Sequence, residues 1–153
     1  HNATVAVGEE ADDLLGILQT DYERLRLLPA PQGLQRIESC IVSIDKDLNQ
    51  IPGNHHNFVK GESYYVSPIE GTRWFYKQLL IGDIVDNLRG IRGLGPIKAG
   101  KFLDDVANEK EMYNIVDELY RSEYLQNSES YLLHNGQLFW IRREEGQLWQ
   151  PPM

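Results

Sequence analysis

The segment "IGDIVDNLRGIRGLGPIKAGKFLDD", residues 81–105, places two carboxylates, Asp83 and Asp86, directly before a glycine-rich basic turn. Pro96 stands where the first turn of a following helix is expected. Glycines let backbone N–H groups approach a phosphate closely, and such contacts hold a nucleic acid backbone without reading its bases. The residues expected to make these contacts are Arg89, Arg92, Gly93, Gly95, Lys98 and Lys101. Taken alone, a purely structural helix–turn–helix is an equal alternative.

Composition restricts the class of protein around this segment. The chain has 153 residues, 41% of them hydrophobic, and a formal net charge of −8, so it can bury one ordinary core and form one domain or a large part of one. Its apolar runs are too short to span a bilayer, and no basic-then-apolar signal pattern opens it. We therefore expect no membrane association and a cytoplasmic location, in a bacterium or a phage-infected host. The single cysteine, Cys40, lies in an apolar run and is expected to be buried.

The periodicity of the apolar residues predicts a mixed α/β chain. Helical spacing is found in residues 10–28, residues 70–83, the segment from Pro96 onward and residues 109–125. Strand patterns are found in residues 3–7, 38–44 and 64–66. The near-continuous apolar run at 38–44 is typical of a parallel sheet that is covered on both faces. Residues 138–152 are expected to form a hairpin or a packed tail.

Carboxylates gather where three of these predicted elements begin or end. The three clusters are Glu10, Asp12 and Asp13; Asp45 and Asp47; and Asp83 and Asp86. In open α/β sheets ligands bind beyond the carboxyl ends of the strands, so two clusters at strand ends could share one crevice. Magnesium prefers such oxygen ligands. For any one cluster, helix capping and solvation remain the alternative.

Three motifs, in order, resemble those of one family. "GDIVDNLRGIRGLGPIKAGKFL" resembles the helix–three-turn–helix signature of the 5′-nuclease superfamily, which includes flap endonucleases, bacteriophage 5′–3′ exonucleases and the 5′-nuclease domains of bacterial DNA polymerase I. "GEEADDLLGIL" is similar to the Glu-x-Asp-Asp element of that family, and "IVSIDKDLNQI" to its strand followed by Asp-x-Asp. The resemblance covers about residues 5–105, and the C-terminal segment suggests a phage-type member.

The resemblance implies a metal-dependent 5′–3′ exonuclease or flap endonuclease. Its fold would be α/β, with part of a parallel-sheet, PIN-like or resolvase-like core in residues 1–82 and the helix–three-turn–helix region and tail in 83–153. Two Mg²⁺ or Mn²⁺ ions are implied, with Glu10 and Asp12 serving one ion and Asp13 in support. The second ion would be held by Asp45, Asp47, Asp83 and Asp86. The catalytic set is then Glu10, Asp12, Asp45, Asp47 and Asp83, and the basic turn would hold duplex DNA and a potassium ion.

The sequence also departs from the family pattern. Members carry, before the Glu-x-Asp-Asp element, a strand ending in an aspartate, a further metal-binding aspartate and a basic helical arch, none of which precedes Glu10 here. We therefore expect the C-terminal half of such a nuclease, as a fragment, a split gene product or a degenerate relative. A separate N-terminal half would then be a partner. The alternative is a non-catalytic, structure-specific DNA-binding module.

Other residues suggest binding sites less strongly. His55 and His56 could suggest a metal site, but a solvated loop is the favoured interpretation because no third ligand has suitable spacing. The aromatic residues 74–76 could stack on bases, although packing of their helix is favoured. Arg142 and Arg143 are expected to belong to an ordinary charged turn.

Overall fold

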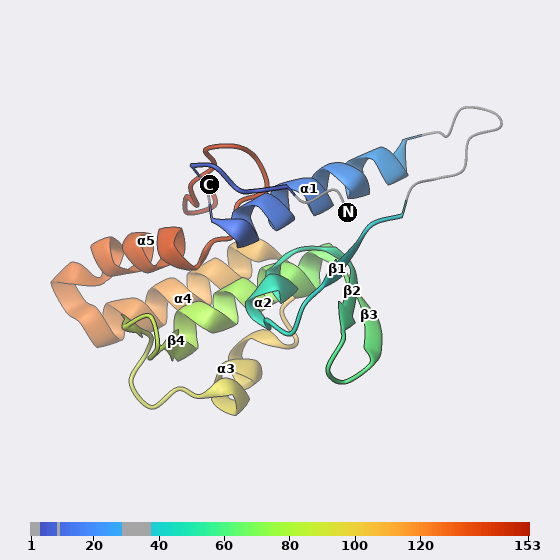
Figure 1. The fold of residues 1–153 in the computed structure, drawn as a ribbon. Coiled ribbons are helices and arrows are strands. Elements are labelled where there is room, and N and C mark those ends of the chain that lie inside the picture. The colour runs from blue at the N-terminus through green and yellow to red at the C-terminus, as the bar shows by residue number, and fades with distance from the viewer. Residues whose placement is uncertain (1–3, 9, 29–37) are drawn as a thin grey trace. The chain divides into compact units, whose positions relative to one another are not determined.

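The computed structural model describes residues 4–8, 10–28 and 38–153, and it consists of two compact units (Figure 1). Unit 1 is His1–Pro68 with Ile141–Gln147, and unit 2 is Ile69–Trp140 with Leu148–Met153. Each unit therefore combines a long segment with a short one from near the C-terminus. The expected division of the chain at residue 82 stays a prediction.

Unit 1 contains a three-stranded sheet in the order β1–β2–β3. Its strands are β1 (Cys40–Val42), β2 (Gly53–Asn57) and β3 (Glu62–Val66), and η1 (Asp47–Gln50) lies between the first two. β1 and β2 are parallel, whereas β2 and β3 are antiparallel, with Gly53 opposite Val66. The α/β class is confirmed, but the sheet is mixed. The four residues between β2 and β3 are too few for a parallel crossover, which needs a dozen or more.

The helix predicted over residues 10–28 is confirmed as α1 (Ala11–Leu27), which contacts β1 and β2. Gly16 allows its close approach, because a Cβ there would collide with the Arg142 carbonyl and the Ile141 side chain. The small core of unit 1 consists of Ile41, Leu48, Ile51 and Ile141.

Two expectations for the strands of unit 1 are wrong. Residues 4–7 form no strand, and the exposed side chains of Val5 and Val7 have no sheet to join; Ala3 lies outside the described residues. The second strand is shorter than predicted, and only Ile41 of its three residues is buried. Because successive side chains of a strand point to opposite faces, Cys40 points away from the core and is exposed.

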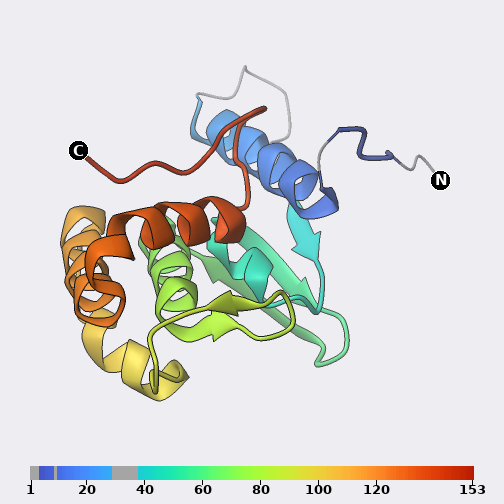
Figure 2. The same ribbon diagram turned by 90° about the vertical axis from the view of Figure 1, so that its left-hand side faces the viewer.

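Unit 2 is mainly helical, and Figure 2 shows two of its helices packed side by side. Its elements are α2 (Pro68–Ile81), β4 (Gly82–Asp83), β5 (Leu88–Arg89), α3 (Pro96–Leu103), α4 (Glu109–Tyr124), η2 (Leu125–Asn127) and α5 (Ser128–Phe139). The packed pair is α4 and α5. Asn108 caps α4, since its side chain accepts a hydrogen bond from the Glu111 N–H at 2.9 Å.

The core of unit 2 confirms the packing role expected for the aromatic residues of α2. Phe75 and Tyr76 are fully buried, and the Phe75 ring lies 5.5 Å from that of Trp149. Trp149 also covers Gly136, where a Cβ would collide with the indole ring. The C-terminal segment is thus a packed tail rather than a hairpin.

No helix in the described part of the chain combines the length and apolar character that crossing a membrane requires.

Candidate functional site

The first acidic cluster lies at the N-terminus of α1, in unit 1. Glu10 is the N-cap residue, and Asp12 and Asp13 belong to the first helical turn. Unsatisfied N–H groups make this end of a helix electropositive, which favours carboxylates there. Asp45 follows β1, and Asp47 begins η1.

Asp12 shows that the two acidic clusters of unit 1 approach each other. Partial burial raises the pKa of its carboxyl group, and the charge of Asp45 raises it further, followed by those of Glu10 and Asp13. The chain thus brings the end of β1 within electrostatic reach of the first turn of α1. A cation near Asp12 would relieve this repulsion.

Asp45 is oriented by its own backbone. Its Oδ1 accepts a hydrogen bond from the Asp47 N–H at 2.9 Å, and its N–H donates to Ser43 Oγ at 3.0 Å. This local turn fixes the carboxylate at the surface with little side-chain freedom left to lose on binding.

Asp13 has a structural contact that distinguishes it from Asp12. Its Oδ1 accepts a hydrogen bond from the Arg142 N–H at 2.8 Å, and its Oδ2 lies 3.4 Å from Arg142 Nε. Asp13 therefore ties α1 to the returning segment 141–147, and Arg142 is more than part of a charged turn. The supporting metal role of Asp13 stays a prediction.

The donor atoms of this cluster suit a hard cation. They are all carboxylate oxygens, yet no three His, Cys, Asp or Glu side chains in the described ranges gather closely enough to hold a metal alone. Mg²⁺ keeps several waters and is usually held by one or two carboxylates together with substrate phosphates. The Asp12 and Asp45 region fits that pattern of binding better than it fits an all-protein cage.

The histidine pair has a different environment from the solvated loop that was expected. His55 lies on β2 with only 3% of its surface exposed, and its Nε2 is 2.8 Å from the Ile51 carbonyl oxygen. Burial lowers its pKa, and that hydrogen bond partly opposes the shift. His56, the next residue of the strand, contacts Ser63 Oγ through Nδ1 at 2.8 Å. Adjacent strand residues point to opposite faces, so the pair does not converge on one ligand.

The third acidic cluster, in unit 2, lies on a hairpin rather than at the end of a helix. α2 ends at Ile81, two residues earlier than predicted, because Gly82 adopts a φ of 76° that a helix does not allow. Gly82 and Asp83 form β4, which pairs with β5 so that Gly82 is opposite Arg89. Asp83 Oδ1 accepts a hydrogen bond from the Val85 N–H at 2.7 Å and lies 3.4 Å from the Asp86 N–H.

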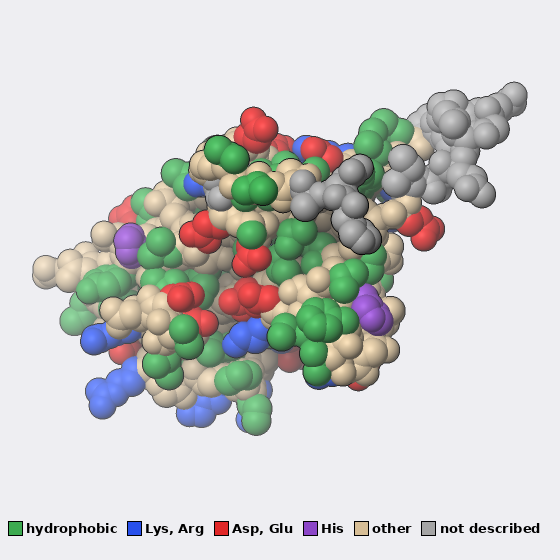
Figure 3. All heavy atoms as spheres, viewed as in Figure 1, with side chains coloured by type: hydrophobic (Ala, Val, Ile, Leu, Met, Phe, Trp, Pro, Cys, Tyr) green, Lys and Arg blue, Asp and Glu red, His purple; other side chains and the backbone are tan. Residues whose placement is uncertain are grey.

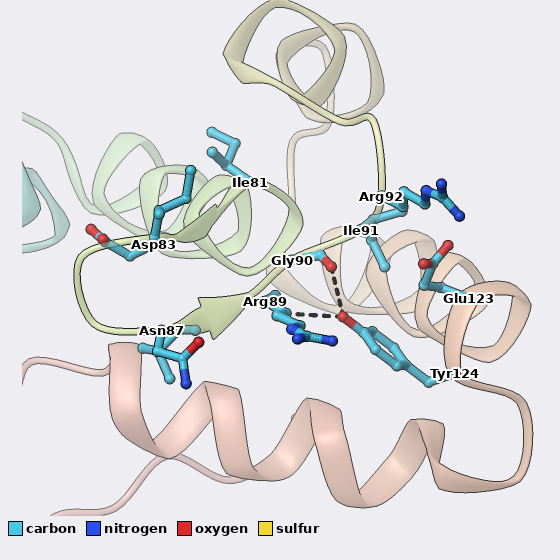
Figure 4. Close-up of a pocket in the computed structure, with 11 residues that line it drawn as sticks. Ile81, Asp83, Asn87, Arg89, Gly90, Ile91, Arg92, Glu123 and Tyr124 are labelled. Carbon is cyan, nitrogen blue, oxygen red and sulfur yellow. Dashed lines mark hydrogen bonds between the residues drawn. The ribbon is translucent and has the colours of Figure 1, made fainter.

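Two side chains that the sequence analysis missed anchor this hairpin. The Tyr124 hydroxyl lies 2.6 Å from the Gly90 carbonyl oxygen and 3.2 Å from that of Arg89 (Figure 4). Asn135 Nδ2 donates to the Arg89 carbonyl at 2.8 Å. Gly90 itself touches the backbone of Leu80 and Gly82, leaving no room for a Cβ.

The basic turn is open to solvent. Arg89, Arg92, Gly93, Lys98 and Lys101 are exposed and Gly95 is half-buried. A Cβ at Gly93 or Gly95 would meet no heavy atom within 4 Å, so a ligand has room to approach the backbone there. Of these basic side chains, Lys98 donates a hydrogen bond from Nζ to the Gly93 carbonyl oxygen at 2.9 Å. Figure 3 shows basic side chains gathered over the region of α3 and the turn before it.

Gly95 and Pro96 begin α3 as predicted, with the proline in the first turn. The apolar side chains of this helix do not all face the core. Ala99 and Leu103, four residues apart, are buried, whereas Ile97 and Phe102 are exposed. The buried stripe of this helix is therefore narrow, with its two residues one turn apart.

Comparison with known proteins gives three informative similarities, although no family model matches the chain. A 5′-3′ exonuclease of Mycoplasma genitalium is 30% identical over 143 residues, covering 84% of this chain and 43% of that protein. The thermostable DNA polymerase I of Thermus aquaticus is 28% identical over 120 residues, covering 73% of this chain and 13% of the polymerase. The thermostable DNA polymerase I of Thermus caldophilus is 25% identical over 118 residues, covering 72% of this chain and 13% of that polymerase.

The chain thus spans less than half the length of each of these curated relatives. All three come from bacteria, and the expectation of a phage-type protein stays a prediction.

Proposed function

The chain belongs to the 5′-nuclease superfamily, and from this membership we propose that it forms part of a metal-dependent 5′–3′ exonuclease or flap endonuclease that hydrolyses DNA. The observation that carries the proposal is the electrostatic proximity of Asp12 and Asp45, because the repulsion between their carboxylates is relieved by a bound cation.

The proposed metal ligands are the carboxylates of the three motifs. They are Glu10, Asp12, Asp13, Asp45 and Asp47 in unit 1, and Asp83 and Asp86 in unit 2. Bound Mg²⁺ or Mn²⁺ would stabilise charge on the attacking and leaving oxygens of the phosphodiester. The chain itself contributes fixed carboxylates: Asp45 and Asp83 are each held by a hydrogen bond from a backbone N–H two residues on.

The basic turn is the proposed docking element for the duplex. Arg89, Arg92, Lys98 and Lys101 would contact phosphates, and the open backbone at Gly93 and Gly95 would allow close approach. These contacts read no bases, so we propose binding to a 5′ end or a 5′ flap of any sequence. A potassium ion at the turn carbonyls would share the Gly93 oxygen with Lys98 or displace its ammonium.

We further propose that an N-terminal half, supplied by a longer chain or a separate one, completes the site. The relatives are more than twice as long as the matched region, which leaves ample sequence for such a half. Groups that act as a unit lose most of their effect when one essential member is missing.

The decisive test is single-turnover cleavage of a labelled 5′-flap DNA with Mg²⁺ or Mn²⁺. We expect weak cleavage by the chain alone and robust cleavage after adding the N-terminal half of a relative. Asp12→Ala and Asp45→Ala should abolish that activity, whereas Asp21→Ala, on an exposed position of α1, should not.

Cleavage that needs no divalent ion, or that survives Asp45→Ala, would refute the proposed site. Robust cleavage by the chain alone, abolished by Asp83→Ala, would instead show that the N-terminal half is dispensable.

A further inference from the structure

Unit 2 contains a pocket of about 440 Å³ beside the β4–β5 hairpin. One wall is the hairpin and the segment after it, and the other is the C-terminal end of α4, with Glu123 and Tyr124 (Figure 4). The pocket is large enough for one nucleotide-sized group.

Hydrogen bonds to α4, α5 and α2 hold the hairpin side of the pocket in place. The Arg89 carbonyl accepts hydrogen bonds from Tyr124 and Asn135, and the Ile91 N–H donates to the Leu80 carbonyl at 2.8 Å. The Arg89 backbone is therefore fixed while its side chain stays exposed. A fixed frame lowers the entropy that a ligand must overcome on binding.

Two guanidinium groups line the pocket without ion-pair partners. Neither Arg89 nor Arg92 forms a salt bridge to any residue in the described part of the chain, although the protein carries a net charge of −8. Of the two carboxylates in the lining, Asp83 already accepts a hydrogen bond from the Val85 N–H, and Glu123 lies on the α4 wall. Guanidinium groups with free donors suit a phosphate, which they can bind through paired hydrogen bonds.

The same pocket has an apolar rim. Ile84 contributes to the lining while 97% of its surface is exposed, and Leu88 and Ile91 lie nearby in the lining. In a duplex the bases are paired and stacked on one another, whereas the base of an unpaired nucleotide is free to pack against such side chains. Arginines beside an apolar rim thus fit a single nucleotide better than a continuous duplex.

We propose that this pocket binds one unpaired nucleotide, with its phosphate at Arg89 and Arg92 and its base against the rim at Ile84. The proposal rests on the proposed function, which supplies DNA as the ligand. The nucleotide could be the unpaired end of a DNA strand or a free 5′-mononucleotide released by cleavage.

The test measures DNA binding by fluorescence anisotropy in EDTA, so that it is independent of metal and cleavage. Five labelled duplexes are compared: one is blunt, two carry a one-nucleotide overhang at the 5′ end or the 3′ end, and two carry an abasic overhang at the 5′ end or the 3′ end. We expect an overhang at one end to tighten binding about tenfold, a gain typical of one base contact, and the abasic overhang to lose most of it.

Two matched variants separate the rim from its neighbour. Ile84→Ser should remove the preference for the overhang, whereas Val85→Ser should keep it, because Val85 is 92% exposed but does not line the pocket. The exposure of both side chains makes misfolding an inadequate explanation of a difference, and thermal melting checks that. Arg89→Gln should weaken every duplex and also abolish the overhang preference.

Free thymidine 5′-monophosphate, added as competitor, distinguishes the two sources of the nucleotide. If the monophosphate competes with the overhang duplex for the wild type but not for Arg92→Gln, the pocket also binds the product of cleavage. If the monophosphate does not compete, the pocket binds strand ends alone. Equal affinity for all five duplexes, or equal effects of Ile84→Ser and Val85→Ser, would overturn the proposal. Metal-dependent cleavage with no overhang preference refutes the pocket alone. Overhang binding with no cleavage, even after the N-terminal half of a relative is added, refutes the nuclease proposal alone.

Discussion

Asp12 is the residue at which repulsion between carboxylates can be measured. Its folded-state pKa is raised above the ordinary value of 3.8 by burial and by neighbouring carboxylates, so the folded protein is favoured when Asp12 is protonated. This contribution is fully present below pH 3.8 and is lost as pH rises through the folded-state pKa.

Asp12→Asn should therefore raise the melting temperature at pH 7 and leave it unchanged near pH 3. The charge of Asp12 also favours the helix N-terminus by about 0.3–1 kcal/mol, and this loss opposes the gain. We expect a net rise of about 1–3 °C by calorimetry. Asp21→Asn, on the same helix, is the control, and a fall in melting temperature for Asp12→Asn at pH 7 would contradict the electrostatic account.

The same residue makes metal binding visible without any assay of activity. A cation that binds only the folded state adds RT ln(1 + [L]/Kd) to the free energy of unfolding, which is about 2.7 kcal/mol at a hundredfold excess over Kd. Millimolar Mn²⁺ should raise the melting temperature of the wild type clearly and that of Asp12→Asn, Asp45→Asn much less. Equal shifts in the two proteins would remove this pair from the proposed ligands.

Gly90 is the residue at which two backbone segments touch. A Cβ there would collide with the Leu80 carbonyl oxygen and the Gly82 N–H, both of which belong to the main chain and cannot move independently. Gly90→Ala should cost about 1–3 kcal/mol of the free energy of unfolding, as overpacking does. Gly95→Ser, an open position at the N-cap of α3, should cost nothing. Urea titration of both variants measures the difference, and equal stability would disprove the contact.

At the scale of elements, periodicity predicted the helices better than the strands. α1 and α4 carry apolar side chains at helical spacing over four turns, so the sequence was sufficient for both. β2 reads Gly-Asn-His-His-Asn, which has no apolar alternation, and it is a strand because β1 and β3 pair with it on both sides. β4 and β5 are two residues each, too short for any periodic signal.

Some residues of the candidate site could likewise be predicted from the sequence, and others could not. The carboxylates and the basic turn lie in short contiguous motifs, which a sequence displays directly. Tyr124 and Asn135 are 35 and 46 residues from the Arg89 carbonyl that they hold, and neither has a local feature that indicates this contact. Long-range hydrogen bonds to the main chain depend on the packing of α4 and α5, which the local pattern does not contain.

The β4–β5 hairpin should accordingly depend on α4 for its rigidity. Tyr124→Phe removes a hydroxyl whose single proton is shared between the Gly90 and Arg89 carbonyls, and such a hydrogen bond contributes about 0.5–1.5 kcal/mol. We expect faster hydrogen exchange at the amides of residues 82–91 and little change elsewhere in α2 and α4. Tyr131→Phe is the control: Tyr131 is 44% exposed, and the substitution keeps the ring that stacks 4.6 Å from that of Tyr124. Uniform acceleration across unit 2 would indicate global destabilisation instead of local release of the hairpin.

At the scale of the whole molecule, the charge distribution opposes the proposed ligand. A protein of net charge −8 repels DNA in general, so the four basic side chains of the turn must act locally, within a Debye length of about 10 Å at 0.1 M salt. Divalent cations should help binding by screening the carboxylates beside the turn.

Duplex binding should therefore depend strongly on salt and hardly on sequence. Each phosphate contact lowers log K by about 0.9 per decade of salt, so the salt slope counts the contacts. Lys98→Glu with Lys101→Glu should reduce that slope by about 2 and weaken all blunt duplexes alike. Lys60→Glu with Lys110→Glu changes the net charge by the same amount, but both residues lie outside the turn. This variant should bind duplex DNA more weakly, whereas the salt slope of log K should stay unchanged because no phosphate contact is lost. Anisotropy titrations from 50 to 300 mM salt, on two duplexes of unrelated sequence, make the measurement. If both double variants changed the slope equally, net charge rather than the turn would control docking; if affinity followed base sequence, the contacts would not be confined to the backbone.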